Sequence, residues 1–153
     1  MAVLFCDYFY VEYVCGVDGM KQSEISDLVG KVPSSEIIEL LRTHKVNSGG
    51  VYKITNTIFG KSYYGQTRNL VRVYDSWKYL LKNKSPRYPF ELCIDYIDFT
   101  TEFTFEIVRM DICEYKRTKI RESCLDRDGN VYNLWKTKEE WGKYKRENYT
   151  RKE

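Results

Sequence analysis

Tyr52 and Tyr63 are the residues of this chain best suited to chemistry, and they stand eleven positions apart in the segment GVYKITNTIFGKSYYGQTRNL, residues 50–70. A phenol has a pKa of about 10, which makes it a poor base at neutral pH. A neighbouring cation lowers that pKa and lets the phenol accept a proton. Lys61 or a bound metal ion is a candidate for this cation. The choice of base between the two tyrosines stays open at this point.

A β-hairpin is the element that would bring the two tyrosines together. Aromatic and β-branched residues dominate both ends of the segment and favour strands. Between them, residues 56–61 supply turn chemistry, and Gly60 can adopt a positive φ. We therefore expect strands at 50–56 and 62–66 joined by a turn. Taken alone, tyrosines at such positions are ordinary sheet residues.

The combined pattern of this segment resembles the opening hairpin of the GIY-YIG nuclease family. The resemblance continues to about residue 134 and implies a small stand-alone member of the phage or homing type. It implies an α/β fold, a three-layer sandwich with a small central antiparallel sheet flanked by helices. It also implies hydrolysis of DNA phosphodiester bonds by water attack. The matching residues are Gly50, Tyr52, Lys53, Ile54, Asn56, Gly60, Lys61, Tyr63, Gly65, Asn69 and Leu70.

The same resemblance implies roles for two residues late in the chain. The run Ile120-Arg121-Glu122 resembles a helix whose glutamate holds a single divalent ion, so Glu122 is the expected ligand of Mg²⁺ or Mn²⁺. The pair Tyr132-Asn133 resembles the motif that follows, so Asn133 is expected to face the leaving group or the phosphate. The two hairpin tyrosines would flank the attacking water. Without the resemblance, Glu122 is an ordinary solvent-facing helical glutamate.

One residue departs from the family pattern. In the family, an arginine lies ten residues after the tyrosine that Tyr63 matches, and Val73 holds that position here. Arg72 is one residue short, and one residue of an α-helix is about 100° of rotation. Losing a guanidinium that stabilises a transition state typically costs orders of magnitude in rate. Either Arg72 or Arg68 substitutes in an active endonuclease, or the chain is a weakened or inactive nucleic-acid-binding or regulatory protein on this fold.

Basic residues gather beside the hairpin, although the net charge of the whole chain is only +3. Between positions 53 and 87 the lysines and arginines are opposed by a single carboxylate, that of Asp75. Such a stripe suits contacts with a phosphate backbone, although runs of charge are more often solvated surface. We expect DNA as the partner, contacted by Lys53, Lys61, Arg68 and Lys78.

Composition argues against several other classes of protein. His44 is the only histidine, which disfavours Ser-His triads and histidine-based nucleases. The five cysteines are odd in number and form no CxxC pair, so we expect free thiols in a reducing compartment rather than zinc ligands. The apolar start lacks a basic n-region, and no segment is long enough to span a membrane. We therefore expect a soluble, cytoplasmic protein without membrane contact.

The remaining patterns predict the elements around the hairpin. We expect an N-terminal extension (1–48), a nuclease-like domain (49–135) and a basic tail (136–153). The extension would hold a strand within 2–14 and two short helices around Gly30 and Pro33, the second capped by Ser34 or Ser35. Further helices are expected at 68–82, near 90–96 and at 113–124, a third strand at 102–109, and a turn at 129–133 leading to an edge segment. The tail from 139 is helical or disordered.

The two helices of the extension loosely resemble a helix-turn-helix, because Gly30 suits its tight turn. The would-be recognition helix is acidic, with Glu36 and Glu39 opposed only by Arg42. We therefore favour two helices packed as an extension over a DNA-reading motif.

Overall fold

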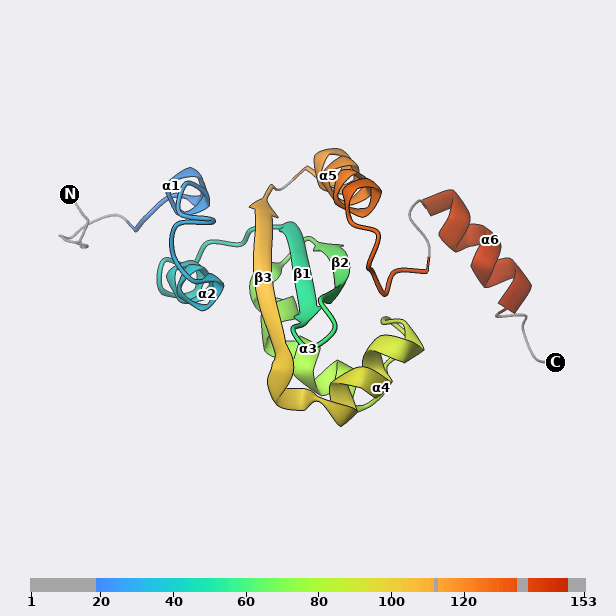
Figure 1. Cartoon of the computed structure of the whole chain (residues 1–153). Helices are drawn as coiled ribbons and strands as arrows, with labels where there is room; N and C mark the ends of the chain where they lie inside the picture. The colour runs from blue at the N-terminus through green and yellow to red at the C-terminus, as the bar shows by residue number, and fades with distance from the viewer. Residues whose placement is uncertain (1–18, 112, 135–137, 149–153) are drawn as a thin grey trace.

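A three-stranded antiparallel sheet in the order β2-β1-β3 lies at the centre of the computed structural model (Figure 1). The structure describes residues 19–111, 113–134 and 138–148. The strands are β1 (Gly50–Asn56), β2 (Lys61–Thr67) and β3 (Phe103–Met110). The predicted α/β fold with a small antiparallel sheet is confirmed. The helices are α1 (Gln22–Ser26), α2 (Ser34–Thr43), α3 (Leu70–Lys82), α4 (Phe90–Asp98), α5 (Glu114–Arg127) and α6 (Lys138–Asn148), with a short 3₁₀ turn at Thr100–Glu102.

Strands β1 and β2 form the predicted hairpin. Gly60 in the turn has a φ of +64°, a value that favours glycine. Ile54 pairs with Tyr63, and Tyr52 pairs with Gly65. Because directly paired residues of antiparallel strands share a face, the side chains of Tyr52 and Tyr63 lie on the same side of the sheet.

Helices α3 and α4 cover the face of the sheet that carries these tyrosines. The Trp77 ring of α3 lies 5.8 Å from the ring of Phe105 on β3 and 5.8 Å from that of Tyr96 on α4. Leu70 and Leu81 of α3 are fully buried in the same core. The apolar spacing predicted for this helix is therefore the face that packs on the sheet.

Helix α3 begins at Leu70, two residues later than predicted, because Asn69 caps it. The side-chain oxygen of Asn69 accepts a hydrogen bond from the backbone N–H of Arg72 at 3.1 Å. This bond satisfies one of the donors that the first helical turn leaves unpaired.

Helix α5 lies against β2 on the opposite side of the sheet, which gives the third layer. The side chain of Gln66 on β2 donates to the hydroxyl of Thr118 on α5 at 2.7 Å. Side chains along a strand point alternately to its two faces, so Gln66 points to the face opposite Tyr63. Helix α5 therefore covers that opposite face. The helix predicted at 113–124 extends to Arg127.

The N-terminal helices α1 and α2 share the core of the sheet domain. Ile25, Ile37 and Leu41 are buried and belong to the same apolar cluster as Tyr52. The prediction that Ser34 or Ser35 caps α2 is wrong, since the capping position is Pro33 and no side chain caps the helix. The hydroxyl of Ser34 instead accepts a hydrogen bond at 2.8 Å from the backbone N–H of Ile107, on the outer edge of β3.

Three further expectations concern the rest of the chain. Residues 138–148 of the C-terminal tail form helix α6, so the helical alternative is the right one for them, while the strand predicted within 2–14 falls outside the described residues. Cys93, Cys113 and Cys124 are free thiols, and the other two cysteines also fall outside the described part. Among the described helices, none is both long and apolar enough to cross a membrane.

Candidate active site

Three tyrosines meet on the sheet face beneath α3 and α4. The rings of Tyr52 (β1) and Tyr63 (β2) have centroids 6.3 Å apart, so the fold brings the two predicted tyrosines together. Tyr88, in the loop before α4, completes the cluster with its ring 5.2 Å from that of Tyr63 and its hydroxyl 3.5 Å from that of Tyr52. We refer to these three residues as the tyrosine cluster. Sequence reasoning missed Tyr88, because it lies outside the hairpin segment that carried the motif.

Gly65 allows Tyr52 to reach across β2. A Cβ atom placed on Gly65 would lie 2.4 Å from the Cζ and 2.5 Å from the hydroxyl oxygen of Tyr52. No real side chain tolerates such contacts, so the phenol of Tyr52 occupies the space directly over this glycine. Gly65 is therefore required for the close approach of the Tyr52 ring, and not for an unusual backbone angle.

Burial sets the proton affinity of the cluster. It raises the pKa of Tyr52 well above its usual value, and the nearby hydroxyls of Tyr63 and Tyr88 raise it further. Burial raises the pKa of Tyr63 to about 12, although a hydrogen bond with Tyr52 opposes the rise. The pKa of Tyr88 is also raised, because burial outweighs the opposing effects of its hydrogen bond with Tyr52 and of the charge of Arg87. Each phenol is therefore neutral at pH 7 in the free protein.

Arg121 is the cation that acts on both hairpin phenols. Its positive charge lowers the pKa of Tyr52 and of Tyr63, against the larger effect of burial. Its Nε donates a hydrogen bond at 3.2 Å to the carbonyl oxygen of Tyr64, which fixes the guanidinium at β2. The sequence signal was its place directly before Glu122, but nothing in the sequence said that α5 would carry this arginine to the tyrosine cluster.

Lys61, the lysine expected near the phenols, has other partners. Its Nζ lies 2.7 Å from a carboxylate oxygen of Glu91 and 4.8 Å from the ring centre of Tyr132. The cation that acts on Tyr52 and Tyr63 is therefore Arg121 of α5 and not Lys61.

Glu122 lies one residue beyond Arg121, and its side chain is 23% exposed. Its carboxylate is 3.8 Å from the Nζ of Lys119, a long ion pair. Among the described residues, no three His, Cys, Asp or Glu side chains gather into a metal cage. Mg²⁺ commonly binds through one or two carboxylates and completes its shell with water and substrate phosphate oxygens. A single partly exposed carboxylate therefore fits a divalent ion of that kind.

Asn133 is fixed against the free edge of β2. Its side-chain oxygen accepts from the backbone N–H of Tyr64 at 2.9 Å, and its side-chain nitrogen donates to the carbonyl oxygen of Tyr64 at 2.9 Å. Two further bonds hold the same segment: the backbone N–H of Ser62 donates to Asn130 at 3.1 Å, and that of Tyr132 donates to Ser62 at 2.7 Å. The predicted edge segment is thus present, and it brings Asn133 beside the strand of Tyr63.

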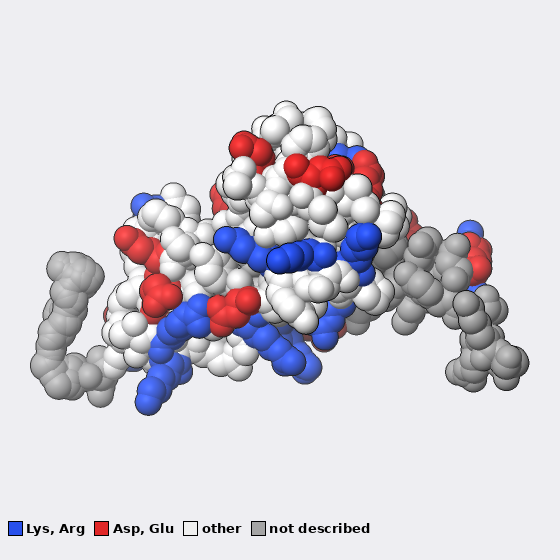
Figure 2. All heavy atoms as spheres, turned by 90° about the horizontal axis from the view of Figure 1, so that it is seen from below, with Lys and Arg blue, Asp and Glu red and all other residues white. Residues whose placement is uncertain are grey.

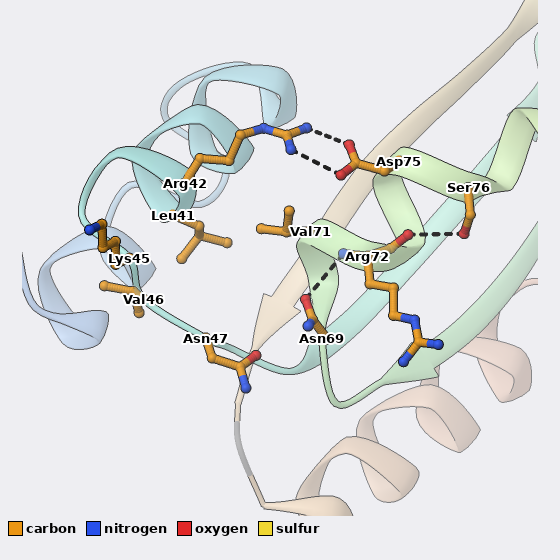
Figure 3. Close-up of a pocket in the computed structure, with 10 residues that line it drawn as sticks. All are labelled: Leu41, Arg42, Lys45, Val46, Asn47, Asn69, Val71, Arg72, Asp75 and Ser76. Atoms are coloured by element: carbon orange, nitrogen blue, oxygen red, sulfur yellow. Dashed lines mark hydrogen bonds and ion pairs between the residues drawn. The ribbon is translucent and has the colours of Figure 1, made fainter.

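Arg72 and Val73 occupy different sides of α3. Val73 is partly buried against the core, whereas Arg72 is exposed. Figure 3 shows the Arg72 side chain extending away from Arg42 and Asp75. No hydrogen bond or ion pair links its guanidinium to another residue in the described part of the chain. Arg121, by contrast, is held at β2 by its hydrogen bond to the carbonyl oxygen of Tyr64.

The predicted nucleic-acid contacts divide into two pairs. Lys53 points to the sheet face away from Tyr52, where its Nζ is 3.5 Å from a carboxylate oxygen of Glu106, and Lys61 is paired as described above. Arg68 and Lys78 are exposed, and neither forms an ion pair within the described ranges. Figure 2 shows lysines and arginines in a broad band across the underside of the molecule.

Comparisons with known proteins give a likeness in structure only. No protein-family model matches the sequence, and no curated protein sequence matches it. A mutant of the catalytic domain of intron endonuclease I-TevI superposes with a TM-score of 0.53 at 17% identity, over 59% of this chain and 96% of the other. The catalytic domain of homing endonuclease I-TevI superposes with a TM-score of 0.50 at 17% identity, over 57% and 98%. The chain therefore has the fold of a GIY-YIG nuclease catalytic domain.

Proposed function

We propose that this chain, built on the fold of a GIY-YIG nuclease catalytic domain, is a metal-dependent DNA endonuclease that hydrolyses phosphodiester bonds by attack of water. The observation that supports the proposal most directly is the tyrosine cluster with the guanidinium of Arg121 acting on two of its phenols. Phosphodiester hydrolysis needs a proton acceptor for the water and positive charge against the transition state. Both kinds of group lie within this one site.

Tyr63 is the better general base of the two hairpin tyrosines. The hydrogen bond with Tyr52 lowers the pKa of Tyr63, whereas the hydrogen bond with Tyr88 raises the pKa of Tyr52. In this mechanism the attacking water lies against both phenols, Tyr63 takes its proton, and Tyr52 and Tyr88 orient it. With a pKa of about 12, Tyr63 is ionised in about one molecule in 10⁵ at pH 7. Because a neutral phenol already carries its proton, only this ionised fraction can accept the proton of the attacking water, and ionisation of Tyr63 to solvent precedes attack.

Arg121, Glu122 and Asn133 supply the remaining roles. Arg121 contributes positive charge to the phosphate, and its bond to Tyr64 keeps the guanidinium in place. Glu122 would hold Mg²⁺ or Mn²⁺ with the help of water and phosphate oxygens, and the bound ion would supply further charge stabilisation. Asn133 would sit beside the leaving oxygen. Of the cations named above, Arg68 and Lys78 are the better DNA contacts, because Lys53 and Lys61 already have carboxylate partners.

A second candidate function is nucleic-acid binding without cleavage. It is favoured by Val73 at the expected arginine position and by the exposed side chain of Arg72. In that case the protein would bind nucleic acid through its basic surface and act as a regulatory protein, without cleaving it.

Incubation with supercoiled plasmid and Mg²⁺ or Mn²⁺ tests the two functions. Four proteins are compared: the parent chain and the Glu122→Gln, Arg121→Ala and Arg72→Ala variants. We expect nicking by the parent, its loss in Glu122→Gln and Arg121→Ala, and turnover retained in Arg72→Ala. Loss in Arg72→Ala with retention in Arg121→Ala would assign the cation to Arg72. A parent that binds DNA and does not cut it would support the second function.

A further inference from the structure

An open groove separates α2 from α3 and lies outside the tyrosine cluster. Its volume is about 580 Å³, and Figure 3 shows the residues that line it. The side chains of Leu41, Val46 and Val71 lie between the two helices and form its apolar floor. One wall therefore comes from α2 and the residues that follow it, and the other from Asn69 and α3.

A bidentate ion pair fixes the relative position of these two walls. Both terminal nitrogens of Arg42 on α2 donate to the carboxylate of Asp75 on α3, one of them at 2.9 Å. The paired geometry adds direction to the attraction between the charges. Leu41 of α2 and Leu70 of α3 also belong to one buried apolar cluster, so the groove is a defined feature of the fold and not a gap between independently moving parts.

The rim of the groove carries excess positive charge. The lining residues Arg42, Lys45 and Arg72 contribute three positive charges, and Asp75 and Glu39, which both pair with Arg42, contribute two negative charges, which leaves +1. Arg42 is neutralised by Asp75, but neither Lys45 nor Arg72 has an ion pair within the described residues. The exposed amide of Asn47 is likewise without a partner there. Two cations and an amide donor are thus free to bind an anion along this rim.

Lys45 stands at a position where its backbone favours glycine. Its φ is +54°, the left-handed conformation in which a helix such as α2 commonly ends. A residue with a Cβ pays for this conformation in stability, by about 1 kcal/mol relative to glycine. Glycine would suit this backbone conformation better, but only lysine adds a positive charge to the rim.

We infer that this groove binds backbone phosphates of the nucleic acid that extends beyond the tyrosine cluster. The inference rests on the proposed function for its choice of nucleic acid as the partner. Asn69 and Arg72, at the α3 end of the groove, lie two and five residues after the end of β2, the strand that carries Tyr63. From Tyr63 to Thr67 the strand spans about 13 Å, or about four base-pair steps of a duplex. The groove would thus contact phosphates several steps away from the bond placed at the tyrosines.

Two glycine substitutions provide a matched test of this assignment. Lys45→Gly removes one positive charge from the rim and places glycine at a backbone position that favours it. A loss of binding in this variant would therefore not result from unfolding. Lys84 ends α3 in the same left-handed conformation, with a φ of +56°, and does not line the groove. Lys84→Gly therefore removes one positive charge with the same change of backbone, away from the proposed site. Asn47→Asp adds a negative charge to the rim at an exposed position.

Fluorescence anisotropy of a labelled 30-base-pair duplex, without divalent ions, would measure affinity over a series of salt concentrations. For Lys45→Gly we expect an affinity about fivefold to tenfold weaker at 0.1 M salt and a salt slope smaller by about one. Asn47→Asp should weaken binding in the same direction. Lys84→Gly removes a charge that belongs to the basic stretch at 53–87 but lies outside the groove, so it should weaken binding less than Lys45→Gly does. Both glycine variants should keep the parent melting temperature or exceed it.

An affinity for Lys45→Gly equal to that of the parent would overturn the inference. So would an equal loss in Lys45→Gly and Lys84→Gly, because net charge alone would then explain it. A parent chain that neither binds nor cleaves DNA would instead overturn the proposed function. A parent that cleaves plasmid while Lys45→Gly binds normally would leave the function standing and remove only the groove.

Discussion

Arg121 and Asn133 donate hydrogen bonds to the same atom, the carbonyl oxygen of Tyr64, at 3.2 Å and 2.9 Å. The two donors come from helix α5 and from the segment after it, and they meet on the free edge of β2. Tyr63 precedes this carbonyl by one residue, and Glu122 follows Arg121 directly. One backbone oxygen of β2 therefore connects this strand to helix α5 and to the segment after α5.

Arg121→Ala should lower the rate of plasmid cleavage by about 10² to 10³-fold, the usual effect of removing one charged stabiliser of a transition state. Arg121→Lys should recover only part of the rate, since an ammonium does not reproduce the guanidinium geometry. Arg72→Ala should raise the KM for DNA and leave kcat within about threefold. A merely structural role of Arg121 would appear as a fall in melting temperature without the selective loss of kcat.

The cleavage rate should rise with pH from 7 to 9 without a plateau. Tyr63 has a pKa of about 12, so its reactive form increases about tenfold per pH unit throughout this range. Tyr63→Phe should be far slower and should lose most of the pH dependence. A plateau near pH 7 in the parent would show that another group titrates as the base.

The same pKa shifts limit the range of that experiment. A buried phenol with a raised pKa stabilises the fold fully below its unfolded value of about 10, and this contribution is lost as the pH rises through the folded value. Cleavage should therefore be measured below pH 10, with circular dichroism at each pH to confirm that the protein is folded.

Gly65→Ala should displace the ring of Tyr52, because the new Cβ would lie 2.4 Å from its Cζ. We expect a loss of about 1–3 kcal/mol in the free energy of unfolding, together with loss of cleavage. Gly129→Ala is the matched control, since a Cβ there would meet no atom within 4 Å. Equal melting temperatures for Gly65→Ala and the parent would mean that Tyr52 does not lie over this glycine.

Asn133→Asp should detach the segment that follows α5 from β2. Aspartate keeps an acceptor for the N–H of Tyr64 but has no donor for its carbonyl, and the partly buried mismatch should cost about 1–3 kcal/mol. Asn83→Asp removes an equivalent donor from the exposed carbonyl of Tyr79 and should have a smaller effect. Hydrogen exchange at the Tyr64 amide would report the detachment, and unchanged protection there would contradict it.

The sequence by itself determined the hairpin and nearly all of the surrounding elements. Strand propensity and Gly60 predicted β1 and β2, and apolar spacing predicted α3 with its buried face. These features were readable because each depends on residues close together in the chain. The cap of α2 was misjudged for the opposite reason: Ser34 bonds to Ile107, a residue far away in the sequence that competes with the local cap.

Only the tertiary structure decided the composition of the site. Tyr88 and Arg121 reach Tyr52 and Tyr63 from a loop and a helix that lie 25 and 58 residues beyond Tyr63, and neither separation leaves a periodic signal. The same holds for the groove, whose walls meet through Arg42 and Asp75, 33 residues apart. Proton affinity and charge at such a place depend on burial and on distances between side chains, and these exist only once the chain is folded.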